Sequence, residues 1–161
     1  METKNNLVKH AMTKDVISVT ENTPVGETFQ IMREHEFNGI PVVNSREENK
    51  LIGLVTDYDL ISKRTAIHLP TFEKLFSDFY IAERHGAAYP DLQKAGMFTV
   101  QDIMNADPLV VNENAPLDEV VILFVEHHRV NPIPVINKDN VLVGIISRYD
   151  IVKLYAKSLG S

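Results

Sequence analysis

Hydrophobic residues recur at helical spacing in two separate stretches of the chain. The apolar positions of the first stretch are Val25, Phe29 and Met32. Those of the second stretch are Leu117, Val120, Val121, Phe124 and Val125. Each stretch follows a proline that is preceded by a capping residue, Thr23 or Asn114, as is typical of a helix start. The pattern predicts two amphipathic helices, each with one buried face.

Short runs of branched apolar residues flank both predicted helices and have the composition of strands. They cover residues 16–19, 40–43 and 51–55 around the first helix, and residues 109–111, 133–136 and 141–146 around the second. A further helix follows the last strand of each set and starts at Thr56 or Ser147. The order β-α-β-β-α therefore occurs twice, which predicts an α+β fold built from two similar subdomains.

The two sets are copies of one another. When residues 8–35 are aligned with residues 100–127, 10 of the 28 positions are identical. The similarity continues from "NGIPVVN" to "NPIPVIN" and from "LIGLVTDYDL" to "LVGIISRYDI", with small gaps in the polar turns. A repeat this long is typical of a duplicated subdomain and is too long for a solenoid. We expect the two copies to span residues 7–64 and 99–158.

Residues 65–98 match neither copy and predict a helical insert between them. Phe72, Phe76 and Phe79 would share one face of its helix, and "HGAAYPD" would end that helix. A face this apolar requires a partner. The sequence leaves two partners open, the protein's own body and a second chain.

Composition and charge narrow the classes of function. The 161 residues include no Cys, which excludes disulfides, thiol nucleophiles and thiolate metal sites. The net charge of −6, with no basic run, argues against nucleic-acid binding. The chain lacks an apolar stretch that could span a membrane and an N-terminal signal peptide, so we expect a cytoplasmic protein without membrane contact.

Neither catalysis nor a metal site is predicted. The chain has no G-x-S-x-G, Walker A or H-E-x-x-H motif, so no nucleophile or metal hydrolase is indicated. His127, His128 and His35 are candidate metal ligands, but adjacent histidines point apart on a helix and lack a carboxylate at zinc-ligand spacing. We expect no enzyme activity and no required cofactor.

A hydroxyl and an aspartate three residues later start the last helix of each copy. The pairs are Thr56 with Asp59, and Ser147 with Asp150. A capping box explains this spacing without any ligand. The same helix start offers N–H groups and a hydroxyl to a phosphate, and the aspartate can accept hydrogen bonds from ribose hydroxyls. Both interpretations can hold at once.

Both copies resemble the CBS domain, a family named for cystathionine β-synthase. The resemblance rests on the "IPV" segments at 40–42 and 133–135 and on "GLVTDYD" and "GIISRYD". Gly53 and Gly144 in the latter motifs let a backbone or a ligand approach closely. Two such domains in tandem resemble a Bateman module, which implies a pseudo-two-fold disc with two clefts between the copies. The family binds AMP, ADP, ATP or S-adenosyl compounds in these clefts, and its modules often dimerise.

The resemblance implies which residues of this chain would bind an adenine nucleotide. Asp59 and Asp150 would hold the ribose hydroxyls, and Thr56 and Ser147 would contact phosphate or ribose. The residues that would flank the adenine are Ile40, Pro41 and Val42 in one copy, and Ile133, Pro134 and Val135 in the other. The backbone that would contact the adenine edge belongs to Ile17, Ser18, Leu109 and Val110.

The two copies differ in the residue that follows the hydroxyl. Arg148 follows Ser147 and suits a phosphate. Asp57 follows Thr56 and would repel a phosphate unless Lys63 or Arg64 compensates. The sequence therefore favours the motif of the second copy as the phosphate site.

The sequence supports a regulatory module and leaves one alternative open. The module would bind an adenine nucleotide and shift an equilibrium in its own homodimer or in an unidentified protein partner. The alternative is a ligand-free scaffold that folds and dimerises with degenerate clefts. A nucleotide-converting enzyme is disfavoured, because the motif supplies no evident general base.

Overall fold

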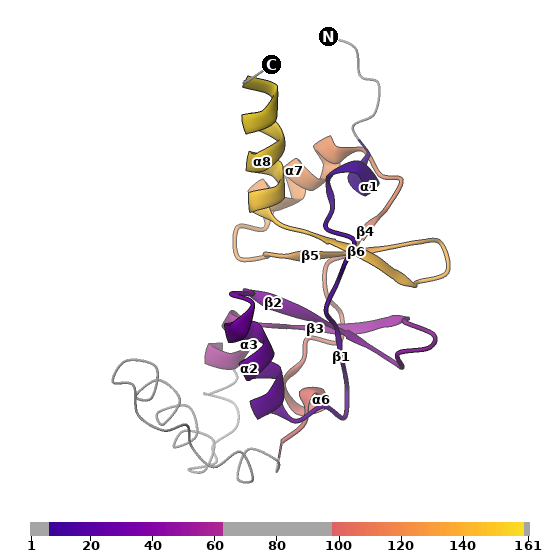
Figure 1. Ribbon diagram of the computed structural model, residues 1–161, viewed down its shortest axis with the longest axis vertical. Coiled ribbons are helices and arrows are strands. Elements are labelled where there is room, and N and C mark those ends of the chain that lie inside the picture. Colours follow the sequence, from indigo (N-terminus) through magenta and orange to yellow (C-terminus); the bar gives the residue numbers. More distant parts are fainter. Residues whose placement is uncertain (1–6, 63–97, 160–161) are drawn as a thin grey trace.

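The protein consists of two three-stranded sheets that meet in the middle of the molecule, with helices on their outer faces (Figure 1). The computed structural model describes residues 7–62 and 98–159. The predicted insert, with Phe72, Phe76 and Phe79, therefore lies outside the described residues.

The predicted order of strands and helices is present in both halves. The first half contains β1 (Val19–Thr20), α2 (Val25–Glu34), β2 (Gly39–Val43), β3 (Leu51–Thr56) and α3 (Asp57–Ser62). The second half contains β4 (Val111–Asn112), α7 (Leu117–Glu126), β5 (Ile133–Ile136), β6 (Leu142–Ile146) and α8 (Arg148–Leu159). In each sheet the middle strand pairs parallel with the first and antiparallel with the third. The α+β fold predicted from the sequence is confirmed.

The starts of α2 and α7 differ from the prediction. Their N-caps are Pro24 and Pro116, and neither helix has a side-chain cap. Thr23 instead accepts a hydrogen bond from the backbone N–H of Thr20 at 3.0 Å, and Asn114 accepts one from Lys9 at 2.9 Å. The two expected caps are wrong because these side chains hold the turn before the helix and the segment beside it.

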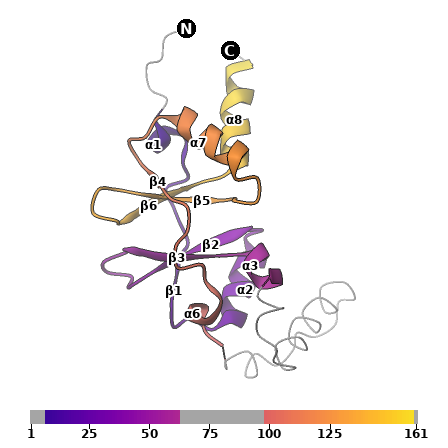
Figure 2. The ribbon, with the colours of Figure 1, turned by 180° about the vertical axis from the view of Figure 1, so that it is seen from behind.

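Two short helices were absent from the sequence-based order, and each belongs to the core of the opposite half. Helix α1 (Val8–Ala11) precedes the first half but contacts α7, α8 and β6 of the second. Helix α6 (Val100–Ile103) precedes the second half and packs into the core of the first, where Figure 2 shows it beside α2. Val8, Val100 and Ile103 are completely buried. Each half therefore completes the hydrophobic core of the other.

The segments that follow these helices add an antiparallel pair to the opposite sheet. Thr13 exchanges two backbone hydrogen bonds of 2.9 Å with Ile145 of β6. Asn105 forms the equivalent pair with Leu54 of β3, at 2.9 and 3.0 Å. Thr13 and Asn105 occupy equivalent positions in the two copies, so each copy pairs with the sheet of the other in the same way.

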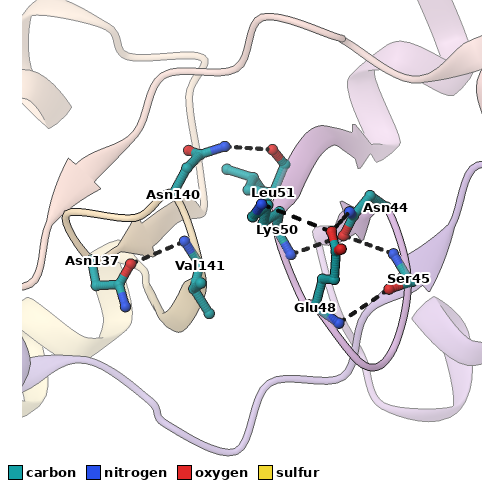
Figure 3. A network of polar contacts seen from close by, with 8 residues as sticks. All are labelled: Asn44, Ser45, Glu48, Lys50, Leu51, Asn137, Asn140 and Val141. Atoms are coloured by element: carbon teal, nitrogen blue, oxygen red, sulfur yellow. Dashed lines mark hydrogen bonds and ion pairs between the residues drawn. The ribbon is translucent and has the colours of Figure 1, made fainter.

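The loops that join the middle strand of each sheet to its third strand are also linked to one another. The side chain of Asn49 donates to the carbonyl of Leu142 at 2.9 Å, and that of Asn140 donates to the carbonyl of Leu51 at 3.0 Å (Figure 3 draws the second). Both asparagines have positive φ, 52° and 61°, a conformation that Asn tolerates better than most residues. A buried cluster of Val43, Leu51 and Leu142 lies at this junction of the two sheets.

Gly53 and Gly144 leave room for the crossing segments. A Cβ on Gly53 would lie 2.8 Å from Met104 Sδ and 3.0 Å from the carbonyl oxygen of Asn105. A Cβ on Gly144 would lie 2.8 Å from Met12 Cγ and 3.1 Å from the carbonyl oxygen of Thr13. The close approach expected at these glycines is therefore made by the protein backbone and a methionine.

Replacement of either glycine by alanine should destabilise the protein. Gly53→Ala and Gly144→Ala should each lower the free energy of unfolding by about 1–3 kcal/mol, because the added methyl group overpacks the crossing. Chemical denaturation measures the change. The double variant Gly144→Ala/Met12→Ala should lose less stability than the two single variants together, since Met12 is the softer neighbour. Strict additivity would show that this contact is not the cause.

Candidate functional site

A cleft of about 310 Å³ lies between the two halves. Ligand sites in proteins usually start at about this size. One wall comes from the first half, from the segment before β1, the loop between α2 and β2, and the start of β2. The opposite wall comes from the loop before β5, the end of β6 and the start of α8. A ligand in this cleft would contact both copies.

Four of the residues singled out from the sequence line this cleft. Ser147 and Asp150 belong to the second half, and Ile17 and Pro41 belong to the first. In the sequence, the hydroxyl–aspartate motif and the strand residues of one copy follow one another along the same part of the chain. The structure instead brings the hydroxyl and aspartate of one copy against the strand segments of the other, because the chain before β1 crosses to β6.

The remaining singled-out residues do not line the cleft. Ile40, Val42, Ile133 and Val135 have no exposed surface and belong to the two cores. Pro134 is buried in β5, Leu109 packs against the second core, and Val110 packs against the cluster between the sheets. Ser18 is half-buried before β1, and Thr56 and Asp59 lie at the start of α3. Their proposed contacts with a ligand stay predictions.

Both hydroxyl–aspartate pairs form capping boxes. Asp150 Oδ2 accepts hydrogen bonds from Ser147 N at 2.8 Å and Ser147 Oγ at 2.7 Å, and Asp150 N donates to Ser147 Oγ at 3.3 Å. Asp59 Oδ2 accepts from Thr56 N at 2.9 Å and Thr56 Oγ1 at 2.7 Å, and Asp59 N donates to Thr56 Oγ1 at 3.2 Å. The structural interpretation of the motif is confirmed at both helix starts.

The capping box uses only one carboxylate oxygen of Asp150, Oδ2, and leaves Oδ1 with a long contact to Thr13. The Thr13 hydroxyl lies 3.5 Å from Asp150 Oδ1, well beyond the usual length of an O–H···O bond. A ligand hydroxyl would make a much shorter, charge-assisted bond to this oxygen. Asp150 can therefore cap α8 and accept a hydrogen bond from a ligand with different oxygens.

Arg148 is directed away from the cleft in this structure. Its guanidinium lies over the ring of Phe124, 4.8 Å from the ring centre, and donates to the carbonyl of His127 at 3.3 Å. Its backbone N–H donates to Asn131 Oδ1 at 3.0 Å. The predicted contact between Arg148 and a phosphate remains untested.

Several lining residues were missed by the sequence analysis. Asn131 and Tyr149 have counterparts at Asn38 and Tyr58, so their repetition in both copies was a usable signal. Glu36 and Phe37 carried no such signal, because they lie where the copies differ by one residue. Glu36 has a positive φ of 55° at the end of α2, where the N–H of Phe37 donates to Met32 O at 2.7 Å. This helix ending usually contains glycine.

Neither a metal-ion cluster nor a membrane-spanning helix occurs in the described part of the chain. Among residues 7–62 and 98–159, no group of three or more His, Cys, Asp or Glu side chains could hold a metal ion. No helix in these ranges is long and apolar enough to cross a membrane.

Comparison with known proteins identifies the family. Residues 8–65 and 100–157 each match the model of the CBS domain. The chain belongs to the CBS-domain family. The predicted tandem CBS pair is thereby confirmed, and the cleft lies between its two CBS domains.

The CBS pair is similar to plant proteins of the same family. CBS domain-containing protein CBSX1, a chloroplast protein of Arabidopsis thaliana, is 32% identical over 152 residues, which cover 88% of this chain and 61% of that protein. The crystal structure of CBSX2 from Arabidopsis thaliana has 25% sequence identity and a TM-score of 0.69, and the match covers 98% of this chain and 99% of that chain. CBSX2 in complex with AMP has 25% identity and a TM-score of 0.68, over 95% and 98% of the two chains.

Proposed function

We propose that this CBS pair is a regulatory module that binds an adenine nucleotide or an S-adenosyl compound in the cleft between its two domains. The main support is the position of Asp150, whose Oδ1 is not engaged by the capping box and lies at a cleft of ligand size. The structural similarity to CBSX2 in complex with AMP adds support. The function is binding, and no residue of the cleft is assigned a catalytic role.

A ligand in this cleft would regulate by linking the two domains. Ile17 and Pro41 lie on one wall, and Ser147 and Asp150 lie on the other. A ligand that contacts both walls binds best when the walls are at one particular separation, and it stabilises that arrangement by its difference in affinity. A second copy of the chain or a protein partner would then bind the stabilised arrangement in preference to others.

The ligand-free scaffold remains the second candidate, and one observation favours it. The two capping boxes account for both aspartates of the motif without a ligand. The distinction between the two functions therefore depends on measured binding.

An adenine compound should raise the melting temperature of the full chain. At a hundredfold excess over Kd, selective binding to the folded state adds about 2.7 kcal/mol. For a chain of this size the shift is roughly 5–10 °C. Thermal unfolding with adenosine, AMP, ADP, ATP and S-adenosylmethionine measures it. No shift with any of these compounds at millimolar concentration would support the ligand-free scaffold.

Asp150→Asn should weaken binding while preserving the fold. Asn can still accept the capping hydrogen bonds, so the free energy of unfolding should fall by less than about 1 kcal/mol. The loss of a charge-assisted hydrogen bond to the ligand is worth about 1.5–3 kcal/mol, so affinity should fall about tenfold to a hundredfold. Isothermal titration of the adenine compound that binds measures the change.

Asp59→Asn is the matched control, because Asp59 makes the same capping box but does not line this cleft. It should cost similar stability and affect affinity less. A larger loss of affinity in Asp59→Asn than in Asp150→Asn would place the site elsewhere.

We further propose that the protein forms a homodimer through α7 and α8. These helices lie side by side at one end of the molecule in both views (Figures 1 and 2). Ile122, Val125 and Val152 are 55%, 75% and 62% exposed there. Apolar side chains this exposed on neighbouring helices favour burial against a second copy.

A cytoplasmic location is also proposed, and cell fractionation tests it.

Sedimentation should show a dimer at micromolar concentration. Val125→Glu/Val152→Glu should shift the protein to monomer, because it would bury charges in the contact. Glu126→Gln, an exposed change next to Val125, should leave the dimer intact. A monomer in the unmodified chain would contradict the dimer proposal without affecting the proposed ligand site.

A further inference from the structure

The walls of the cleft carry an excess of negative charge. Asp15 and Glu36 line it from the first half, and Asp150 lines it from the second. Among the described residues that line the cleft, none is Lys, Arg or His. Among the described lining residues, the formal charges are therefore those of three carboxylates.

The charge of Glu36 is held at the cleft by the backbone. Glu36 follows the last turn of α2 with a φ of 55°, and its N–H donates to Arg33 O at 3.2 Å. The next N–H, of Phe37, closes the same turn on Met32 O. Glycine is the usual residue at such a position, because a side chain is strained there. The chain nevertheless has a carboxylate at this position, at the edge of the cleft.

Several groups that could attract a phosphate at the start of α8 already have partners within the protein. The N–H of Arg148 donates to Asn131 Oδ1 at 3.0 Å, and the N–H of Asp150 donates to Ser147 Oγ at 3.3 Å. The guanidinium of Arg148 is stacked over Phe124. The three carboxylates are not grouped as a metal site, since no cluster of three such ligands exists among the described residues.

From these charges we infer that the cleft selects an adenosine derivative whose 5′ substituent is neutral or cationic, and disfavours a 5′ phosphate. The inference rests on the proposed function, because it assumes that the ribose hydroxyls meet Asp150. A neutral 5′ group, as in 5′-methylthioadenosine, is not repelled by the carboxylates. The positively charged sulfonium of S-adenosylmethionine is attracted to them. The two to four negative charges of AMP, ADP or ATP are repelled.

A tryptophan reporter can measure binding at this cleft alone. The chain contains no Trp, and Tyr149 lines the cleft with 72% of its surface exposed. In a Tyr149→Trp background, the fluorescence of one tryptophan reports each ligand under identical conditions. The probes are adenosine, 5′-methylthioadenosine, S-adenosylmethionine, AMP, and ATP with and without Mg²⁺.

Adenosine, 5′-methylthioadenosine and S-adenosylmethionine should each bind at least about tenfold more tightly than AMP or ATP. In Asp15→Asn/Glu36→Gln the affinity for AMP should rise at least about tenfold, while that for adenosine should change by less than about twofold. The charge-matched control is Glu27→Gln/Glu119→Gln, which removes two exposed carboxylates from α2 and α7 that do not line the cleft. It should leave the ratio of the AMP and adenosine affinities unchanged.

Two results would overturn the inference and leave the proposed function standing. One is AMP or ATP binding as tightly as adenosine or more tightly. The other is a change in the affinity ratio that is as large in the control as in Asp15→Asn/Glu36→Gln, because the net charge of the chain would then be responsible. Binding of none of the probes, by fluorescence or by calorimetry on the unmodified chain, would overturn both the inference and the proposed function.

Discussion

The structure depends on the exchange of two short segments, one from each half. Helix α1 precedes the first sheet but fills the core of the second half, and α6 does the reverse. The pairs formed by Thr13 with Ile145 and by Asn105 with Leu54 fix where each segment crosses. Neither half has a complete core without the segment that precedes the other. The two domains should therefore unfold together and not as separate units.

The cleft is a consequence of this exchange. Because Thr13 pairs with β6, the chain that follows it passes the start of α8 before it reaches its own sheet. Ile17 thereby comes to the same cleft as Ser147 and Asp150. The segment that crosses between the domains thus also forms part of one wall of the cleft. A ligand that changed the separation of the walls would act directly on the junction of the two domains, with no need for a longer path.

The sequence predicted those features that local physical chemistry determines. Helices α2 and α7 were visible because ten residues suffice to show an apolar face, and the capping boxes were visible because their geometry is contained in four residues. Helices α1 and α6 were missed because four residues show no period, and their burial depends on a partner far away in the sequence. The starts of α2 and α7 were misassigned because Thr23 and Asn114 form contacts outside the helix that they were expected to cap. The exchange of α1 and α6 leaves no local sequence pattern, because each copy on its own has the full β-α-β-β-α order.

The chemistry of the cleft shows why a motif and the folded site around it can indicate different ligands. In the sequence, Arg148 lies beside Ser147 and Asp150, and a helix start with an arginine suggests a phosphate. In the structure, Arg148 packs on Phe124, while the other two acidic residues that line the cleft, Asp15 and Glu36, come from the other copy. Asp15 has a counterpart at Asp107, but Glu36 lies where the copies differ in length and cannot be inferred from the repeat. The motif therefore fixes the side chain that would meet the ribose, whereas the opposite domain fixes the charge that the rest of the ligand must match.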